Sequence, residues 1–133
     1  MRALTISAHG GLDSLEYRTD VADPHASPGT VRVRIKSAAL NHLDVFMLAG
    51  LPGVNIVAPW VMGADGAGVI DEVGEGVSSV VVGDAVVINP GISDGTCEFC
   101  LQGEQSECVR FGLLGEHRPG TLADYVEIGR AHV

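Results

Sequence analysis

Apolar and basic residues alternate most regularly in residues 31–36, where every second position is a valine or an isoleucine. A period of two is that of a β-strand with one buried and one exposed face. The pattern therefore predicts a half-buried strand over residues 31–37, whose core-facing side chains are Val31, Val33 and Ile35. Its other face is expected to be solvated and consists of Arg32, Arg34 and Lys36.

Shorter apolar stretches predict further strands, because each is bounded by residues that favour turns. These strands are expected at residues 3–7, 15–18, 69–73, 85–89, 111–114 and 121–128. The turn at Gly10-Gly11 should join the first two into a hairpin. One short helix is expected, capped by Asn41 and ended by Gly50. Short strands with a single helix favour a small barrel or a curled sheet.

The glycine-rich residues 63–76 are superficially similar to a dinucleotide-binding fingerprint. That fingerprint requires an apolar strand before it and a long helix after it. Neither flank is present, and residues 69–73 have the pattern of a strand instead. No nucleotide site is therefore predicted in this chain.

Composition narrows the class of protein. The chain has 133 residues, of which 46% are hydrophobic, so it can bury one core and is expected to form one domain. With a formal charge of −9 and no basic patch, nucleic acid and anionic membranes are not expected partners. No apolar run approaches the ~20 residues of a membrane span, and the first residues lack the features of a signal peptide. Clustered cysteines without an export signal indicate the cytoplasm.

All three cysteines lie in one short segment, at Cys97, Cys100 and Cys108, and Asp94 precedes them. Three thiolates and one carboxylate are enough for a closed tetrahedral zinc site. The cysteines are also compatible with one disulfide and a free thiol, or with a redox Cys-x-x-Cys pair. The flanking glycines and glutamates favour a loop around a cation, and hence a structural zinc that holds a lobe together.

Several motifs follow one another along the chain. They are the G-x-D-G-A-G-V-x-x-x-V-G-x-G-V of residues 63–77, the G-D-x-V of residues 83–86, the cysteine segment, and the G-T-L-A-D-Y-V of residues 120–126. This set resembles the medium-chain dehydrogenase/reductase superfamily, and more closely its zinc-type alcohol dehydrogenases and their quinone-reductase-like relatives.

The resemblance implies that residues 1–133 are the N-terminal catalytic domain of such an enzyme. That domain is mainly β: a GroES-like, partly open β-barrel with one or two short helices and a zinc-binding lobe. The family's Rossmann domain, which binds NAD or NADP, would follow and is absent from this chain.

The implied function is that of an NAD(P)-dependent oxidoreductase with a structural zinc and no catalytic zinc. Its substrate would be a small-molecule carbonyl, alcohol, quinone or enone, and the full-length enzyme would be a homo-oligomer. The isolated domain itself is expected to be inactive. The alternative is a stand-alone zinc-binding module that acts in interactions and not in catalysis.

The family's structural zinc has four cysteine ligands, and the resemblance places them on Asp94, Cys97, Cys100 and Cys108. Aspartate thus replaces the first cysteine and can still bind the metal. The family's catalytic zinc ligands are a cysteine, a histidine and a glutamate, which fall on Asn41, Ala64 and Asp65. Because an amide is a poor zinc ligand and a methyl group is none, no catalytic zinc is expected.

The polar residues gathered near that position are candidates for catalysis, and they are Asn41, His42, Asp44 and Asp65. Asn41 can donate a hydrogen bond to a substrate oxygen, and His42 can supply or orient a proton. Equally, Asn41 and Asp44 can serve only as helix caps, and Asp65 can only satisfy turn amides. The position of the family's proton-relaying hydroxyl falls on Leu43, which cannot act in this way.

The remaining histidines are weaker candidates. His117 is expected either to line the mouth of a cleft or to be a loop residue. Surface positions are expected for His9, His25 and His132.

Overall fold

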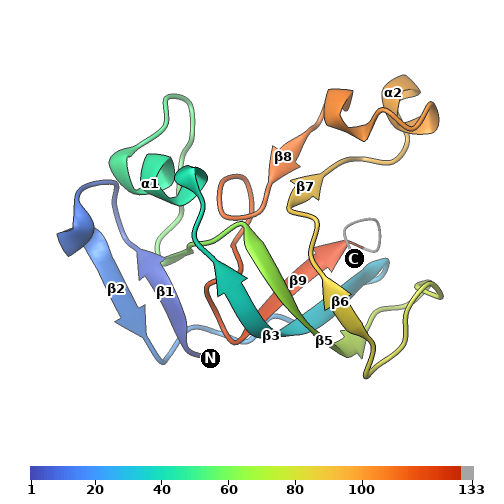
Figure 1. Cartoon of the computed structure of the whole chain (residues 1–133), viewed down its shortest axis with the longest axis horizontal. Coiled ribbons are helices and arrows are strands. Elements are labelled where there is room, and N and C mark those ends of the chain that lie inside the picture. Colours follow the sequence, from blue (N-terminus) through green and yellow to red (C-terminus); the bar gives the residue numbers. More distant parts are fainter. Residues whose placement is uncertain (130–133) are drawn as a thin grey trace.

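The computed structural model describes residues 1–129, so His132 lies outside the described residues. Figure 1 shows a mainly β domain with open sheets and two short helices. The strands are β1 (Ala3–Ile6), β2 (Leu15–Arg18), β3 (Thr30–Ala39), β4 (Trp60–Val61), β5 (Asp65–Val73), β6 (Ala85–Val87), β7 (Gly91–Ile92), β8 (Gly112–Leu113) and β9 (Tyr125–Gly129). The helices are α1 (His42–Ala49), α2 (Glu98–Leu101) and the 3-10 turns η1 (Leu12–Ser14) and η2 (Gln105–Glu107).

The strands form three antiparallel sheets that do not close into a barrel. Their orders are β2-β1-β4, β6-β5-β3-β9 and β7-β8. The first two strands form the expected hairpin, and β3 is the expected half-buried strand, with Val31 and Val33 fully buried. The expectation of a mainly β, partly open barrel is therefore confirmed.

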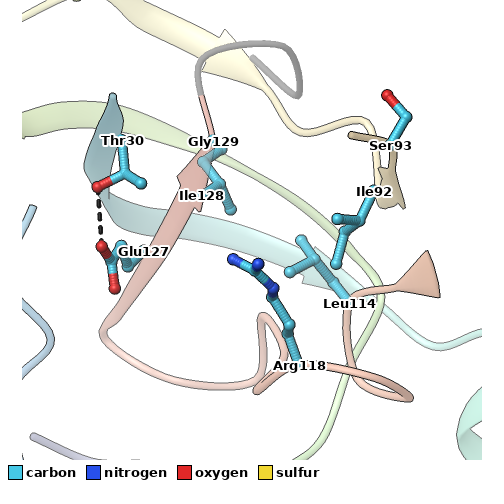
Figure 2. A pocket seen from close by; sticks show the side chains of 8 residues that line it. All are labelled: Thr30, Ile92, Ser93, Leu114, Arg118, Glu127, Ile128 and Gly129. Carbon is cyan, nitrogen blue, oxygen red and sulfur yellow. Dashed lines mark hydrogen bonds between the residues drawn. The ribbon is translucent and has the colours of Figure 1, made fainter. Parts of the chain in front are cut away.

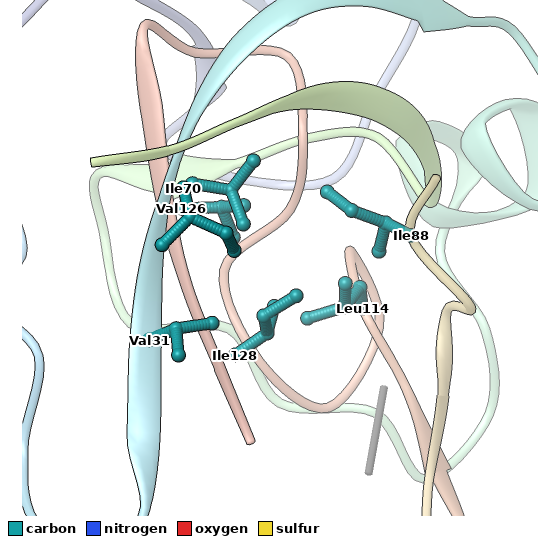
Figure 3. Packing of buried hydrophobic residues seen from close by; sticks show 7 residues of the cluster. Val31, Ile70, Ile88, Leu114, Val126 and Ile128 are labelled. Atoms are coloured by element: carbon teal, nitrogen blue, oxygen red, sulfur yellow. The ribbon is translucent and has the colours of Figure 1, made fainter. Parts of the chain in front are cut away.

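Two hydrophobic clusters hold the domain together. The larger one packs on the inner face of the four-stranded sheet, and Figure 3 shows its side chains converging from several strands. Its members are Val31, Val33, Ile70, Ile88, Leu114, Val126 and Ile128. The smaller cluster joins α1 to the first sheet and consists of Ile6, Met47, Leu48, Trp60 and Met62. The indole N–H of Trp60 also donates a hydrogen bond to the carbonyl oxygen of Gly115 at 2.8 Å.

Strand β5 begins at Asp65 rather than at residue 69 because glycines let it approach β3 closely. A Cβ atom added at Gly68 would lie 2.2 Å from the carbonyl oxygen of Arg34 in the paired strand. Glycine has low strand propensity, so the pattern of residues alone places the start of the strand too late. The glycine-rich run is thus a strand that fits against its neighbour.

Other bounds differ from expectation at the ends of strands. Residues 60–61 form β4, for which no strand was predicted, and the last predicted strand is regular only from Tyr125. Before that point, Ala123 contributes only an isolated bridge to Ala3. The short helix α2 was not expected from the pattern, because its one turn lies in a polar, glycine-bounded loop.

The basic face of β3 is only partly solvated, and the expectation is wrong for Arg32. The Nε of Arg32 donates to Asp71 at 2.9 Å, and its guanidinium carbon lies 5.1 Å from the ring centroid of Tyr125. Its side chain is 18% exposed, whereas that of Arg34 is 47% exposed. The partners lie on neighbouring strands, so a local pattern cannot reveal them.

Replacing Gly68 with alanine should destabilise the domain by about 1–3 kcal/mol, because the added methyl group must push β3 and β5 apart. Urea unfolding followed by the fluorescence of Trp60, the only tryptophan, measures this change. Gly11→Ala is the control, since an added Cβ there meets nothing closer than 3.6 Å. Equal stability of the two variants would contradict the close approach of the strands.

Candidate functional site

The cysteine lobe is connected to the rest of the domain by the paired strands β7 and β8. Strands β7 and β8 pair as a two-stranded ribbon, and the chain between them carries α2 and η2 (Figure 1). Cys97 is the residue before α2, and Cys100 lies within its single turn. Cys108 follows η2, at the point where the chain returns toward β8. These local turns bring three cysteines that are distributed over twelve residues to one place.

Four potential ligand atoms meet in this lobe. One carboxylate oxygen of Asp94 and the sulfurs of the three cysteines all lie within 4.8 Å of one another. The sulfurs of Cys97 and Cys100 are 3.5 Å apart, and all three cysteines are free. Cys108 is buried, while Cys97 and Cys100 are half-buried. The sequence therefore identified a cluster that the fold brings together.

The carboxylate of Asp94 is held in place by the backbone. Its Oδ1 accepts hydrogen bonds from the N–H groups of Thr96 and Cys97, both at 2.9 Å. These two bonds hold the pKa of Asp94 well below its usual range, so the group is a carboxylate at neutral pH. Since Oδ1 takes both N–H groups, Oδ2 is the oxygen left for a cation.

Backbone N–H groups also point at the sulfurs. Cys108 Sγ accepts from the N–H of Asp94 at 3.3 Å and from that of Arg110 at 3.4 Å. The pKa of Cys97 is lowered by N–H donation from Cys100 and Val109. By contrast, desolvation and then the neighbouring thiols raise the pKa of Cys100 to about 11. Crowded sulfurs resist full ionisation unless a cation neutralises them.

The donor set fits zinc in chemistry and in size. Tetrahedral zinc with bonds of about 2.0–2.3 Å places its ligand atoms about 3.3–3.8 Å apart. Because the four atoms already lie within 4.8 Å, small side-chain movements suffice to reach that geometry. Within residues 1–129, this is the one group of three or more metal-ligating side chains that the fold assembles.

The second candidate site lies where β3 ends and β5 begins. Asn41 caps α1, because its Oδ1 accepts from the N–H of Leu43 at 3.2 Å. Its own N–H donates to the carboxylate of Asp44 at 2.7 Å, which completes a capping box. Its Nδ2 donates to Oδ2 of Asp65 at 2.9 Å. The fold thus brings Asn41, Asp44 and Asp65 together.

The other residues near this position differ in exposure. His42 is exposed and stacks on Phe46, with ring centroids 6.2 Å apart. Ala64 is 2% exposed, and the carbonyl oxygen of Asp65 beside it accepts from the hydroxyl of the buried Thr121 at 2.9 Å. The start of β5 is therefore firmly held, and Ala64 offers only a methyl group there.

Two histidines have structural contacts. Nδ1 of His9 lies 2.7 Å from the carbonyl oxygen of Met47, so this half-buried ring supports the end of α1 and is not simply a surface residue. His117 is an exposed loop residue whose Nδ1 accepts from the N–H of Leu113 at 3.2 Å. His25 is exposed, as expected. No sequence pattern distinguishes His9, because its partner is distant in the chain.

A further cavity, of about 190 Å³, lies at the end of β9 (Figure 2). In it the side chain of Arg118 points toward Ile128 and Leu114, and the hydroxyl of Thr30 donates to Glu127 at 2.8 Å. Sequence analysis gave no signal for this cavity, which forms only when β3, β7, β9 and the loop after β8 meet.

Residues 27–133 match the family model of the alcohol dehydrogenase GroES-like domain. The chain belongs to this family. A crystal structure of an NAD-dependent alcohol dehydrogenase superimposes on it with a TM-score of 0.93 and 51% identity, covering 99% of this chain and 38% of that one. The recognition of a zinc-type alcohol dehydrogenase domain of the medium-chain superfamily is thereby confirmed.

Two curated relatives of this GroES-like domain have different activities in their names. An alcohol dehydrogenase of Geobacillus stearothermophilus is 36% identical over 116 residues, which are 86% of this chain and 34% of that protein. An acryloyl-coenzyme A reductase of Metallosphaera sedula is 37% identical over 109 residues, which are 81% of this chain and 31% of that protein. The chain thus spans about a third of the length of both relatives.

Neither α1 nor α2, the helices of residues 1–129, has the length and apolar character needed to cross a membrane.

Replacing Asp44 with alanine should lower the free energy of unfolding by about 1 kcal/mol, because it removes half of the capping box on α1. Chemical denaturation of the variant measures the loss. His42→Ala, which changes an exposed neighbour, should stay within about 0.5 kcal/mol of the parent. A neutral Asp44→Ala variant would show that the cap does not stabilise this helix.

Proposed function

We propose that this chain is the catalytic-domain portion of a zinc-containing, NAD(P)-dependent oxidoreductase. The observation that carries the proposal is the match, along 99% of the chain, to the corresponding part of an NAD-dependent alcohol dehydrogenase. In this proposal the nicotinamide cofactor is held by a Rossmann domain outside these 133 residues. Localisation in the cytoplasm and a homo-oligomeric full-length enzyme remain predictions.

The cysteine lobe would hold a structural zinc through Asp94, Cys97, Cys100 and Cys108. The ionised carboxylate, the N–H groups that point at the sulfurs and the close grouping of the four ligand atoms support this assignment. When bound, zinc would neutralise the crowded ligands and cross-link the turn of α2 to the start of β8. Four protein ligands leave no position for substrate, so the metal would stabilise the lobe.

Catalysis would proceed without zinc at the substrate. The family's ligand positions hold Asn41, Ala64 and Asp65, and the first and last of these are hydrogen-bonded to each other. Asn41 retains a second N–H on Nδ2, which can donate to the oxygen of a carbonyl or enone. The nicotinamide supplies the hydride, so orientation and polarisation of the substrate are the tasks left for this domain.

Proton supply would fall to the groups around Asn41. His42 is exposed at the start of α1 and can exchange its proton with solvent. Asp44 is engaged by the backbone N–H of Asn41, and we therefore assign it to holding the helix rather than to proton transfer. Candidate substrates are small carbonyls, alcohols, quinones and enones.

Zinc content tests the metal site. The purified chain should contain about one zinc per chain by elemental analysis, with thiols that react slowly. Cys108→Ser should lose zinc and melt at the lower temperature of the chelator-treated parent, because metal binding contributes to folding. The matched control, Ser106→Ala, should keep both zinc and melting temperature. Retention of zinc by Cys108→Ser, or a Cys97–Cys100 disulfide in the parent, would refute the assignment.

Activity tests the oxidoreductase. The isolated 133-residue chain should not turn over NADH or NADPH with a ketone, an enone or a quinone, since no cofactor domain is present in it. The product of the gene read beyond Val133, or of a companion chain that binds dinucleotide, should do so. If the gene stops at Val133 and no such companion exists, the stand-alone zinc-binding module becomes the better account. Turnover by the isolated chain would also contradict the proposal.

A further inference from the structure

The outer face of β3 borders a hollow that the proposed function does not use. Arg34 and Lys36 of this strand both line the hollow, and the register of β3 against β5 shifts between Ile35 and Ser37. The start of β9 lies next to Arg34, because Arg34 pairs with Tyr125. The hollow has a volume of about 290 Å³ and is lined by Arg2, Arg34, Ile35, Lys36, Asp124 and Tyr125.

Arg2 also lines the hollow and is held there by an ion pair with Asp124. Its guanidinium binds the carboxylate of Asp124 with two nitrogens, at 3.1 Å from Nε and 2.8 Å from Nη2 to the same oxygen. The backbones of Arg2 and Asp124 are also bonded to each other, since the N–H of Asp124 donates to the carbonyl oxygen of Arg2 at 3.0 Å. The first residues of the chain are thereby tied to the rim of the hollow.

Two of the cations are left without close compensation. The nearest carboxylate oxygen to Arg34 is that of Asp71 at 3.9 Å, and Asp71 is already bound by Arg32 at 2.9 Å. Lys36 forms no ion pair with any residue of the range 1–129. The chain has eight lysines and arginines and seventeen aspartates and glutamates, and three of the eight basic residues line this hollow.

One side of the hollow is formed by Tyr125, whose ring is in contact with a neighbouring side chain. The ring of Tyr125 stacks against the guanidinium of Arg32, which is itself held by Asp71. Arg34 is in register with Tyr125 across the β3–β9 pair. The hollow is therefore lined both by cationic side chains and by the aromatic side chain of Tyr125.

We propose that this hollow binds the phosphate group of a small phosphorylated molecule. A phosphate monoester carries a charge of about −1.5 to −2 at neutral pH, which matches the combined charge of Lys36, which has no ion pair, and Arg34, whose carboxylate partner is 3.9 Å away. Arginine binds phosphate oxygens through its planar fork, and lysine adds a point charge. The strongly acidic remainder of the chain repels nucleic acid, and the size of the hollow suits a single phosphoryl group with part of its organic substituent.

The proposal is tested by NMR titration of the 133-residue chain with ribose 5-phosphate and, separately, with inorganic phosphate. Chloride at the same ionic strength is the reference. The backbone amides of residues 34–36 and 124–125 should shift in a saturable manner, whereas those of the cysteine lobe should not. Tighter binding of ribose 5-phosphate identifies an organic phosphate as the ligand, and equal binding identifies free phosphate; either supports the phosphate site.

Variants test whether the charges of Arg34 and Lys36 are responsible for phosphate binding. Arg34→Gln combined with Lys36→Gln should weaken binding at least about tenfold, because two charge-assisted contacts are lost. Arg110→Gln, which removes an exposed arginine of the cysteine lobe, is the matched control and should bind like the parent. The charge-conserving variant Lys36→Arg should retain binding. No saturable shift beyond that caused by chloride, or an equal loss in Arg110→Gln, would overturn the proposal.

Discussion

The pairing of β3 with β5 is the constraint on which the rest of the domain depends. This register runs from Val31 opposite Val73 to Ala39 opposite Asp65. It therefore determines which residues face each other at both ends of the strand pair. At one end, Val31 and its neighbours enter the larger core. At the other end, the register places the residues after Ala39 beside Asp65, and the side chain of Asn41 donates a hydrogen bond to the carboxylate of Asp65. The helix α1 therefore starts at a position that the sheet determines.

The same constraint explains what the sequence could and could not predict. Clean alternation identifies β3, and capping residues identify α1, because both signals are local. The start of β5 is hidden, since Gly68 is required by the closeness of Arg34 in another strand and lowers the apparent strand propensity. Arg32 is misjudged for a related reason: Asp71, which binds it, lies on the partner strand. Contacts between distant segments leave little trace in a local pattern.

The two candidate sites differ in how far sequence can identify them. The cysteine lobe is built from local turns, so the spacing of Cys97, Cys100 and Asp94 already contains most of its geometry. The contact between Asn41 and Asp65 joins residues 24 positions apart and depends on strand register, which only the fold supplies. The resemblance to a known family identified Asn41 and Asp65 as candidate residues, but it did not predict the hydrogen bond between them. The role of His9 in supporting α1 carried no signal at all.

The chemistry available at the start of α1 follows from the hydrogen bonds that fix the amide of Asn41. Since Oδ1 accepts from Leu43 and Nδ2 donates to Asp65, the amide cannot flip without losing both bonds. One N–H of Nδ2 and the second oxygen of Asp65 remain for a ligand, which is a donor beside an acceptor. Two such groups are too few to hold zinc. They are suited, instead, to orienting an oxygen that exchanges between carbonyl and hydroxyl, and this is the physical basis on which we propose hydride transfer without a catalytic metal.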